Sequence, residues 1–159
     1  MCTLRNFPNQ IEHCIEWGRD QFNTLFVDRV QDALSYLDKP EQFLLQQKQN
    51  QTSSAAVATL VEIKKLFEMK QTSDFARCVE IARDTFVFNF DHNIRDLMNI
   101  FPKDHLDSHG MPFWSGPKRA PDHITFDAND ASHLAFIQAM ANLIAFNLGM
   151  PEVRDIAAI

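Results

Sequence analysis

The sequence predicts an all-α fold, a single helical domain (residues 1–159) with one long irregular loop that contains proline and glycine. Three observations carry this prediction. Apolar residues recur at intervals of three and four along most of the chain, as they do on one face of a helix. Only four of the 159 residues are glycine, so long stretches lack a helix breaker. No stretch alternates apolar and polar residues persuasively, although residues 124–126 would suit a brief strand pairing.

The first predicted helix begins directly after Asn9. Asn9 and Glu12 form the capping-box pattern, in which each side chain bonds an amide at the helix start. One face carries apolar side chains at helical spacing and is expected to be buried: Ile11, Cys14, Ile15, Phe22, Leu25 and Phe26. Because Cys14 lies on this face, we predict that it is a small core residue rather than a reactive thiol.

The same spacing predicts further helices as far as residue 101. They cover about residues 30–37, 43–45, 57–67, 75–90 and 93–101. Pro40 closes the first of them, Ser53 or Ser54 is predicted to cap the third, and Asp74 belongs to the start signal of the fourth. The glutamine-rich patch at 46–51 is expected to be a solvated helix end or loop. Cys78 lies on the apolar face of the fourth helix and is also predicted to be a core residue.

Residues 102–129 differ in composition from the helices on either side. They hold two of the four glycines and three of the six histidines, and prolines recur among them. An irregular stretch of this length inside a compact domain is usually functional or mobile. Phe113 and Trp114 are predicted to anchor it into the core through their rings. After it, Asn129 or Asp130 is predicted to cap a last helix that ends at Gly149. The residues expected to face inward from this helix are Leu134, Ile137, Ala141, Ile144, Ala145 and Leu148.

Charge, hydropathy and cysteine usage exclude several classes of function. The net charge is −6 and the pI about 5.4, which argues against nucleic acid as a partner because phosphate binding needs clustered Lys and Arg. We find no apolar run close to the roughly 18 to 20 residues of a membrane span and no signal peptide, so no membrane partner is expected. The three cysteines are sparse and lack paired spacing, which predicts free thiols in a reducing compartment.

Two arrangements that would indicate a metal or nucleotide site are weak or missing in the sequence. His105 and His109 are four residues apart and His123 follows. Pro102 and Gly110 argue against a continuous helix there, so no metal site is predicted. The sequence has no glycine-rich phosphate-binding loop, so we expect this chain to hold no cofactor of its own and not to bind ATP itself.

The first residues carry the best candidate for chemistry. Cys2 precedes the hydroxyl of Thr3, and Arg5 follows shortly before the first helix. Positive charge and a helix N-terminus both lower the pKa of a thiol, so both would favour a thiolate at Cys2. Taken alone, this local chemistry does not single out Cys2, and a protease-like pairing with a distant histidine has no recognisable signature here. Arg5 and Asn6 are equally well explained as residues that fix the turn into the first helix.

Two motifs resemble signatures of one enzyme family. The first is MCTLRNFPN at 1–9, followed by IEH at 11–13, and it resembles the segment around the catalytic cysteine of ubiquitin-activating enzymes. The second is PFWSGPKR at 112–119, leading to TFD at 125–127, and it resembles a second signature of the same family. The order and spacing are those of the family across nearly the whole chain. Residues 1–159 therefore resemble the second catalytic cysteine half-domain, excised from a larger enzyme.

The resemblance implies a reaction, cofactors and partners. In the parent enzyme, adenylation domains of the same chain use ATP and magnesium to adenylate the C-terminus of ubiquitin. The family's catalytic cysteine, which matches Cys2, attacks the adenylate and forms a thioester. A ubiquitin-conjugating enzyme then accepts ubiquitin onto its own cysteine. This fragment alone is expected to be unable to activate ubiquitin, and the enzyme is expected in the cytoplasm and nucleus.

Supporting roles and alternatives follow from the same resemblance. Thr3 would hydrogen-bond the sulfur or the developing oxyanion, Arg5 would bias Cys2 towards the thiolate, and Asn6 would orient the acyl group. The loop at 102–127 would cover Cys2 between cycles, or would instead be an anchored structural loop. Two other functions stay open, an activating-enzyme domain for another ubiquitin-like modifier and a non-catalytic helical docking module for conjugating enzymes.

Overall fold

The computed structural model describes residues 10–50 and 52–155, and in this part of the chain the predicted all-α class is confirmed. The predicted capping residue Asn9 lies outside the described residues. The elements follow one another in the order α2 (Ile11–Phe22), η1 (Asn23–Asp28), α3 (Arg29–Asp38), α4 (Pro40–Asn50), α5 (Ser53–Thr72), α6 (Phe75–Val87), η2 (Phe88–His92), α7 (Asn93–Ile100) and α8 (Ala131–Leu148). The only bridge among the described residues is an isolated antiparallel one that joins Leu106 and Pro112, so residues 124–126 form no strand.

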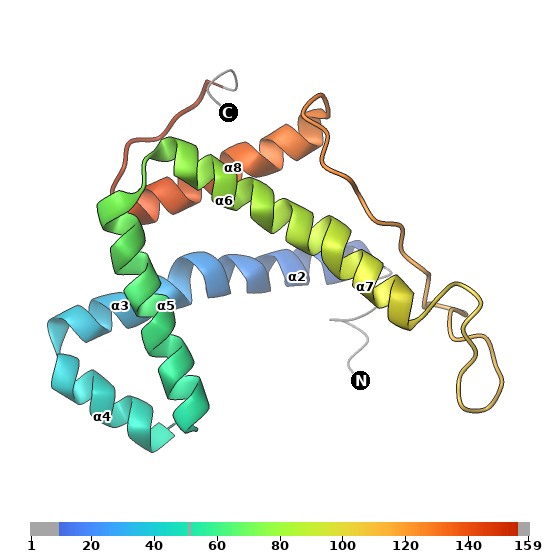
Figure 1. The fold of residues 1–159 in the computed structure, drawn as a ribbon, viewed down its shortest axis with the longest axis horizontal. Helices are drawn as coiled ribbons and strands as arrows, with labels where there is room; N and C mark the ends of the chain where they lie inside the picture. Colours follow the sequence, from blue (N-terminus) through green and yellow to red (C-terminus); the bar gives the residue numbers. More distant parts are fainter. Residues whose placement is uncertain (1–9, 51, 156–159) are drawn as a thin grey trace.

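Two pairs of predicted helices are continuous runs. The predicted gap between residues 26 and 30 is occupied by the π-helical turn η1, which joins α2 directly to α3. A second π-helical turn, η2, joins α6 to α7, and the resulting rod crosses the molecule in Figure 1. A π turn adds one residue to a helical turn without breaking the helix. The predicted breaks at these positions were therefore wrong, because apolar spacing slips there while the backbone stays helical.

Helix caps agree with the prediction at α6 and α8 and differ at α5. Asp74 accepts a hydrogen bond from the Arg77 amide, and Asp130 accepts from the amides of residues 132 and 133. Gly149 ends α8 in the left-handed conformation, with φ of 77°. The cap of α5 is Thr52 instead of Ser53 or Ser54, and its hydroxyl accepts from the Ala55 amide. The glutamine-rich patch is helical up to Asn50, the last residue of α4.

The main core lies where α6 crosses α8. Cys78 and Ala82 of α6 and Ala141 and Ala145 of α8 have no exposed surface. Small side chains at a helix crossing let the two backbones approach closely, and larger residues then fill the space on either side. The prediction that Cys78 is a core residue is confirmed. In Figure 1 α8 lies alongside α6, and α2 passes on the other side of the same rod.

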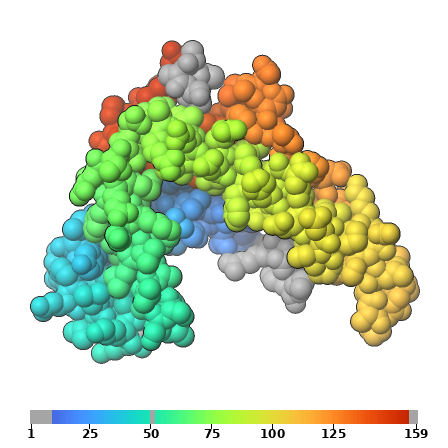
Figure 2. Space-filling view, in the orientation of Figure 1, coloured from blue at the N-terminus to red at the C-terminus, as the bar shows by residue number. Residues whose placement is uncertain are grey.

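A second, smaller core stabilises the arm formed by α3, α4 and α5. Ala33, Phe43 and Ile63 are buried there, with Tyr36 packed edge-on against Phe43. The described part of the domain therefore has two cores, since α5 is 20 residues long and carries the arm away from the main core. The space-filling view in Figure 2 shows this arm and the long loop as two projections on either side of a hollow.

Helix α8 packs into the main core on one side and is largely apolar on its outer side as well. It has 18 residues without Asp, Glu, Lys or Arg and is long and apolar enough to cross a membrane by length and composition. The expectation that no segment approaches this length was therefore wrong, because Ser, His, Gln and Asn interrupt the apolar run without adding charge. Six residues of α8 are buried inside the domain, and core helices of globular proteins share this composition. The absence of a membrane partner stays a prediction.

Candidate functional site

The predicted site residues lie outside the described residues, and their roles stay predictions: Cys2, Thr3, Arg5 and Asn6. The structure describes the element that follows them, the first turn of α2. Gln10 occupies the N-cap position in an extended conformation and makes no side-chain capping bond. The amides at the start of a helix and the helix dipole favour negative charge in front of it. This end of α2 is thus compatible with a thiolate in the preceding segment.

The two described thiols have opposite environments. Cys78 is fully buried, and this burial raises the pKa of its thiol. It is therefore held as a neutral core side chain. Cys14 is exposed on α2, so the prediction that it is a core residue was wrong. The physical reason is that the predicted inner face of this helix is largely uncovered, with Ile11 67% and Ile15 64% exposed.

The second motif is fastened to the end of α7 by aromatic contacts. The Phe113 ring stacks on Phe101 with 4.5 Å between ring centres and 6° between ring planes. The Trp114 indole N–H donates to the carbonyl oxygens of Phe101 at 2.9 Å and Pro102 at 3.1 Å. The ammonium of Lys118 lies 4.6 Å from the centre of the Phe113 ring, a cation–π contact. Phe113 and Trp114 do anchor the loop, but on the exposed end of a helix instead of in the core as predicted.

A short hairpin within the loop is organised by Asp107. Its carboxylate accepts hydrogen bonds from the amides of His109 at 2.8 Å and Met111 at 3.0 Å, which lowers the pKa of Asp107. Gly110 provides the left-handed turn, with φ of 76°. Lys103 before the hairpin and Asp122 after it form a 3.0 Å ion pair across the base of the loop. These contacts give the loop a defined structure over this region.

The end of the loop returns to η2 and α8. The Ile124 amide donates to the carbonyl oxygen of Phe90, a residue of η2, at 2.8 Å. Phe126 packs edge-on against Phe86 with 5.5 Å between ring centres, and it also faces the ring of His133. The prediction that the loop is anchored is therefore confirmed for these contacts, while the prediction that it covers Cys2 lies outside the described residues.

Sequence reasoning missed two structural asparagines on α8. The Asn147 side-chain amide donates to the carbonyl oxygen of Phe26 in η1 at 3.1 Å, across 121 positions of sequence. The Asn142 side chain both accepts from the Val153 amide at 2.8 Å and donates to the Val153 carbonyl at 2.9 Å. Asn142 thus holds the extended segment after α8 against the helix. The available signal was an amide side chain inside an otherwise apolar helix, where polar groups need partners.

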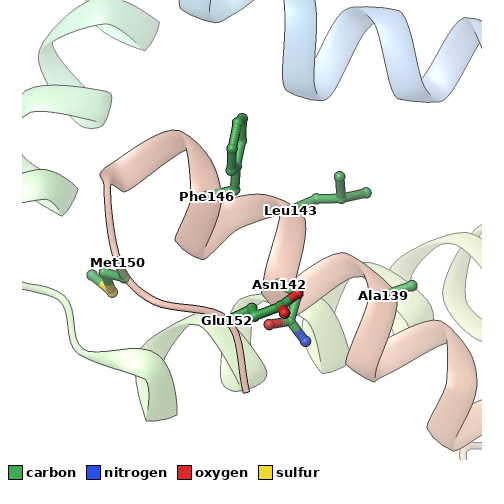
Figure 3. Close-up of a pocket in the computed structure, with 6 residues that line it drawn as sticks. All are labelled: Ala139, Asn142, Leu143, Phe146, Met150 and Glu152. Atoms are coloured by element: carbon green, nitrogen blue, oxygen red, sulfur yellow. The ribbon is translucent and has the colours of Figure 1, made fainter. Parts of the chain in front are cut away.

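Two adjacent hollows lie beside α8, and Ala139 and Leu143 line both. One of about 200 Å³ lies between α2 and η1 on one side and α8 on the other, and Thr85 of α6 and Asn89 of η2 also line it. The next, about 420 Å³, is lined by Ala139, Asn142, Leu143, Phe146, Met150 and Glu152 (Figure 3). Among the described residues no group of three or more His, Cys, Asp or Glu is placed to hold a metal ion.

The comparisons with known proteins agree with both sequence motifs. The family model for the ubiquitin-activating enzyme SCCH domain matches residues 8–159. This chain belongs to that family. It is 43% identical over 159 residues to ubiquitin-like modifier-activating enzyme 1 of Dictyostelium discoideum and 36% identical over 159 residues to its human counterpart. It is also 42% identical over 155 residues to ubiquitin-activating enzyme E1 1 of Schizosaccharomyces pombe.

The SCCH domain described here spans only a part of these relatives. The alignments cover 98 to 100% of this chain but 15% of each of the three relatives. The family match starts at residue 8, whereas the two alignments of 159 residues include Cys2. Assignment to the family thus confirms the resemblance and the fold class. The role of individual residues stays a matter for experiment.

Proposed function

We propose that this chain is the domain of a ubiquitin-activating enzyme that presents Cys2 as the thioester-forming nucleophile. The parent polypeptide would carry the adenylation domains, with their ATP and magnesium, outside residues 1–159. Ubiquitin and ubiquitin-conjugating enzymes are the proposed partners, and the cytoplasm and nucleus are the proposed location. Family membership over 152 residues and the cysteine motif at 1–9 support this proposal.

The proposed reaction is an acyl transfer to sulfur. The Cys2 thiolate attacks the carbonyl carbon of the ubiquitin adenylate, a carbon–sulfur bond forms, and the carbon–oxygen bond to the phosphate breaks as AMP leaves with the electron pair. The proton lost from the thiol passes to solvent. The thiolate of a conjugating enzyme then attacks the thioester, and Cys2 leaves as a thiolate. Because nucleophilicity falls together with pKa, a modestly lowered pKa suits both steps better than an extreme one.

The environments of Cys14 and Cys78 support Cys2 as the thiol that accepts ubiquitin. Cys78 is enclosed between α6 and α8, where no acyl group of a protein substrate can reach it without unfolding. Cys14 is exposed and is therefore the one competing acceptor among the described residues. Cys14 is the fourth residue of α2 and follows the motif directly instead of standing within it. Cys2 stands in the motif that resembles the family's catalytic segment.

The roles proposed for the neighbours of Cys2 are separable. Thr3 would stabilise the sulfur or the developing oxyanion, Arg5 would favour the thiolate, and Asn6 would orient the acyl group. Thr3→Ala and Arg5→Ala should each slow thioester formation in the full enzyme. An unchanged rate would leave these side chains only a structural part in the turn.

The deciding experiment joins this domain to its adenylation domains and supplies ATP, magnesium and ubiquitin. Cys2→Ala should abolish the reducible ubiquitin adduct while adenylate formation continues. Cys14→Ala is the matched control, since it removes an exposed thiol and should leave the adduct intact. An adduct that persists in Cys2→Ala and is lost in Cys14→Ala would refute the assignment and favour a docking module. Replacing ubiquitin by another ubiquitin-like modifier in the same assay tests the choice of modifier.

A further inference from the structure

The outer side of α8 has the composition of an interior surface. A helix that is apolar on every side is normally covered on every side. α8 carries no Asp, Glu, Lys or Arg, and its face opposite the core includes Ala139, Leu143 and Phe146. The Phe146 ring is 77% exposed, and Figure 3 shows it standing off the helix, away from Asn142 and Glu152. Within the described residues nothing covers this ring, and its neighbours Ala139 and Leu143 line both hollows.

A stripe on α2 borders the same hollow. Ile11, Ile15, Gly18 and Phe22 are spaced by four, three and four residues, so they share one face of the helix. Gly18 and Phe22 line the hollow of about 200 Å³ directly, opposite Ala139 and Leu143. Ile11 and Ile15 extend the stripe with more than half of their surface exposed. The result is an apolar groove with α2 as one wall and α8 as the other.

Gly18 has no explanation within this part of the chain. Glycine inside a helix costs about 0.5–1 kcal/mol relative to alanine. The backbone at Gly18 is ordinary helix, and an added Cβ would meet no atom within 4 Å. Neither conformation nor crowding inside the described chain therefore requires glycine here. A second backbone that approaches α2 closely from outside would require it.

We propose that an apolar helix face from a part of the parent polypeptide outside residues 1–159 packs into this groove. The inference rests on the proposed function only in placing this domain within a longer activating enzyme. The twelve residues that line the hollow between α2 and α8 include no charged side chain, and Glu152 is the only charged residue of the neighbouring one. Permanent interfaces are apolar in this way, whereas transient encounters depend on charged rims that guide association.

The length of the relatives and the shape of the groove favour this occupant over others. This chain covers 15% of each of three relatives, so most of such a polypeptide would remain available as a permanent neighbour. A second copy of the domain would bring one concave groove against another and leave both unfilled, since a two-fold contact pairs the same surface with itself. A convex helix with small and apolar side chains fits a concave, mainly apolar groove that is flanked by Phe146 and Phe22 and has Glu152 as its one charged lining residue.

Photo-crosslinking in the full-length polypeptide tests the proposal without requiring activity. p-Benzoylphenylalanine at position 146 keeps the ring and should cross-link to a peptide outside residues 1–159, identified by mass spectrometry after digestion. Position 88 is the matched control, because Phe88 is also an exposed phenylalanine, 58% exposed, and does not line the groove. It should give at least five-fold less of that cross-linked peptide.

The other outcomes overturn the proposal. A cross-linked species of doubled mass would show a second copy in the groove, and products confined to residues 1–159 would show that no other part of the polypeptide fills it. Gly18→Leu provides an independent check, since its Cβ meets no atom within 4 Å and the side chain beyond it would occupy the groove. It should reduce the cross-link from position 146 several-fold, and an unchanged yield would contradict a close backbone approach. None of these readouts depends on Cys2, ATP or ubiquitin, so they stand apart from the thioester assay.

Discussion

Replacing Asn147 by leucine tests how the two halves of the main core are joined. Asn147 of α8 donates to the carbonyl oxygen of Phe26 in η1 across 3.1 Å, at a partly buried position. Leucine fills a similar volume but cannot donate, so the carbonyl oxygen loses this partner. An intramolecular hydrogen bond contributes about 0.5–1.5 kcal/mol, and an acceptor left without a partner in a buried site costs about 1–3 kcal/mol. Because this site is only partly buried, we expect the free energy of unfolding to fall by about 1–2 kcal/mol.

The control is the same exchange at Asn99, an exposed residue of α7. Both substitutions replace asparagine by a better helix former, so the difference between the variants isolates the hydrogen bond. Urea unfolding followed by circular dichroism should give a lower midpoint for Asn147→Leu at an unchanged slope. For a chain of this size, the thermal midpoint should fall by about 2–4 °C for each kcal/mol lost. Equal stability of Asn147→Leu and Asn99→Leu would show that the bond contributes nothing to joining α8 and η1.

Four further predictions concern the core, the thiols and the loop. Ile137→Ala should lower the free energy of unfolding by about 2–5 kcal/mol in urea titrations, because Ile137 is almost completely buried and the shorter side chain would leave a cavity. In the folded protein, maleimide should label Cys14 rapidly and Cys78 only on unfolding. Burial raises the pKa of the Cys78 thiol, so this thiol loses its proton at lower pH in the unfolded chain than in the folded one. The free energy of unfolding should therefore fall as pH rises above about 9.0. Cys78→Ala should remove this part of the pH dependence. Trp114→Phe keeps a ring but removes both indole hydrogen bonds, so amide exchange in the loop after Phe101 should accelerate while global stability falls by only about 1 kcal/mol.

The parts of the fold that local chemistry specifies could be predicted from sequence. Asp74, Asp130 and Gly149 mark helix ends in the sequence and also in the structure, because capping depends on residues within one turn of the helix end. The π turns could not be predicted in the same way. Each contains a carbonyl oxygen that accepts from a group far away in sequence: Phe26 accepts from the Asn147 side chain and Phe90 from the Ile124 amide. Such contacts cannot be read from local spacing.

Only part of the candidate site could be predicted from the sequence. The two motifs indicate the family, and the family match over residues 8–159 confirms it. The contacts of Trp114 with the end of α7 did not follow from the sequence, since an aromatic pair in a loop has many possible partners. The atoms around Cys2 lie outside the described residues, so its pKa and its neighbours stay predictions.

The sequence by itself determined the helical class, most helix ends and the family to which the domain belongs. Only the tertiary structure decided which apolar faces are covered. Cys14 and Cys78 both lie on apolar helix faces in the sequence, yet Cys78 is enclosed by α8 and Cys14 is exposed. The physical reason is that periodicity shows which side chains share a face of a helix, whereas burial depends on whether another element packs against that face. For α6 that element is α8, and for the stripe on α2 it is absent from the described residues.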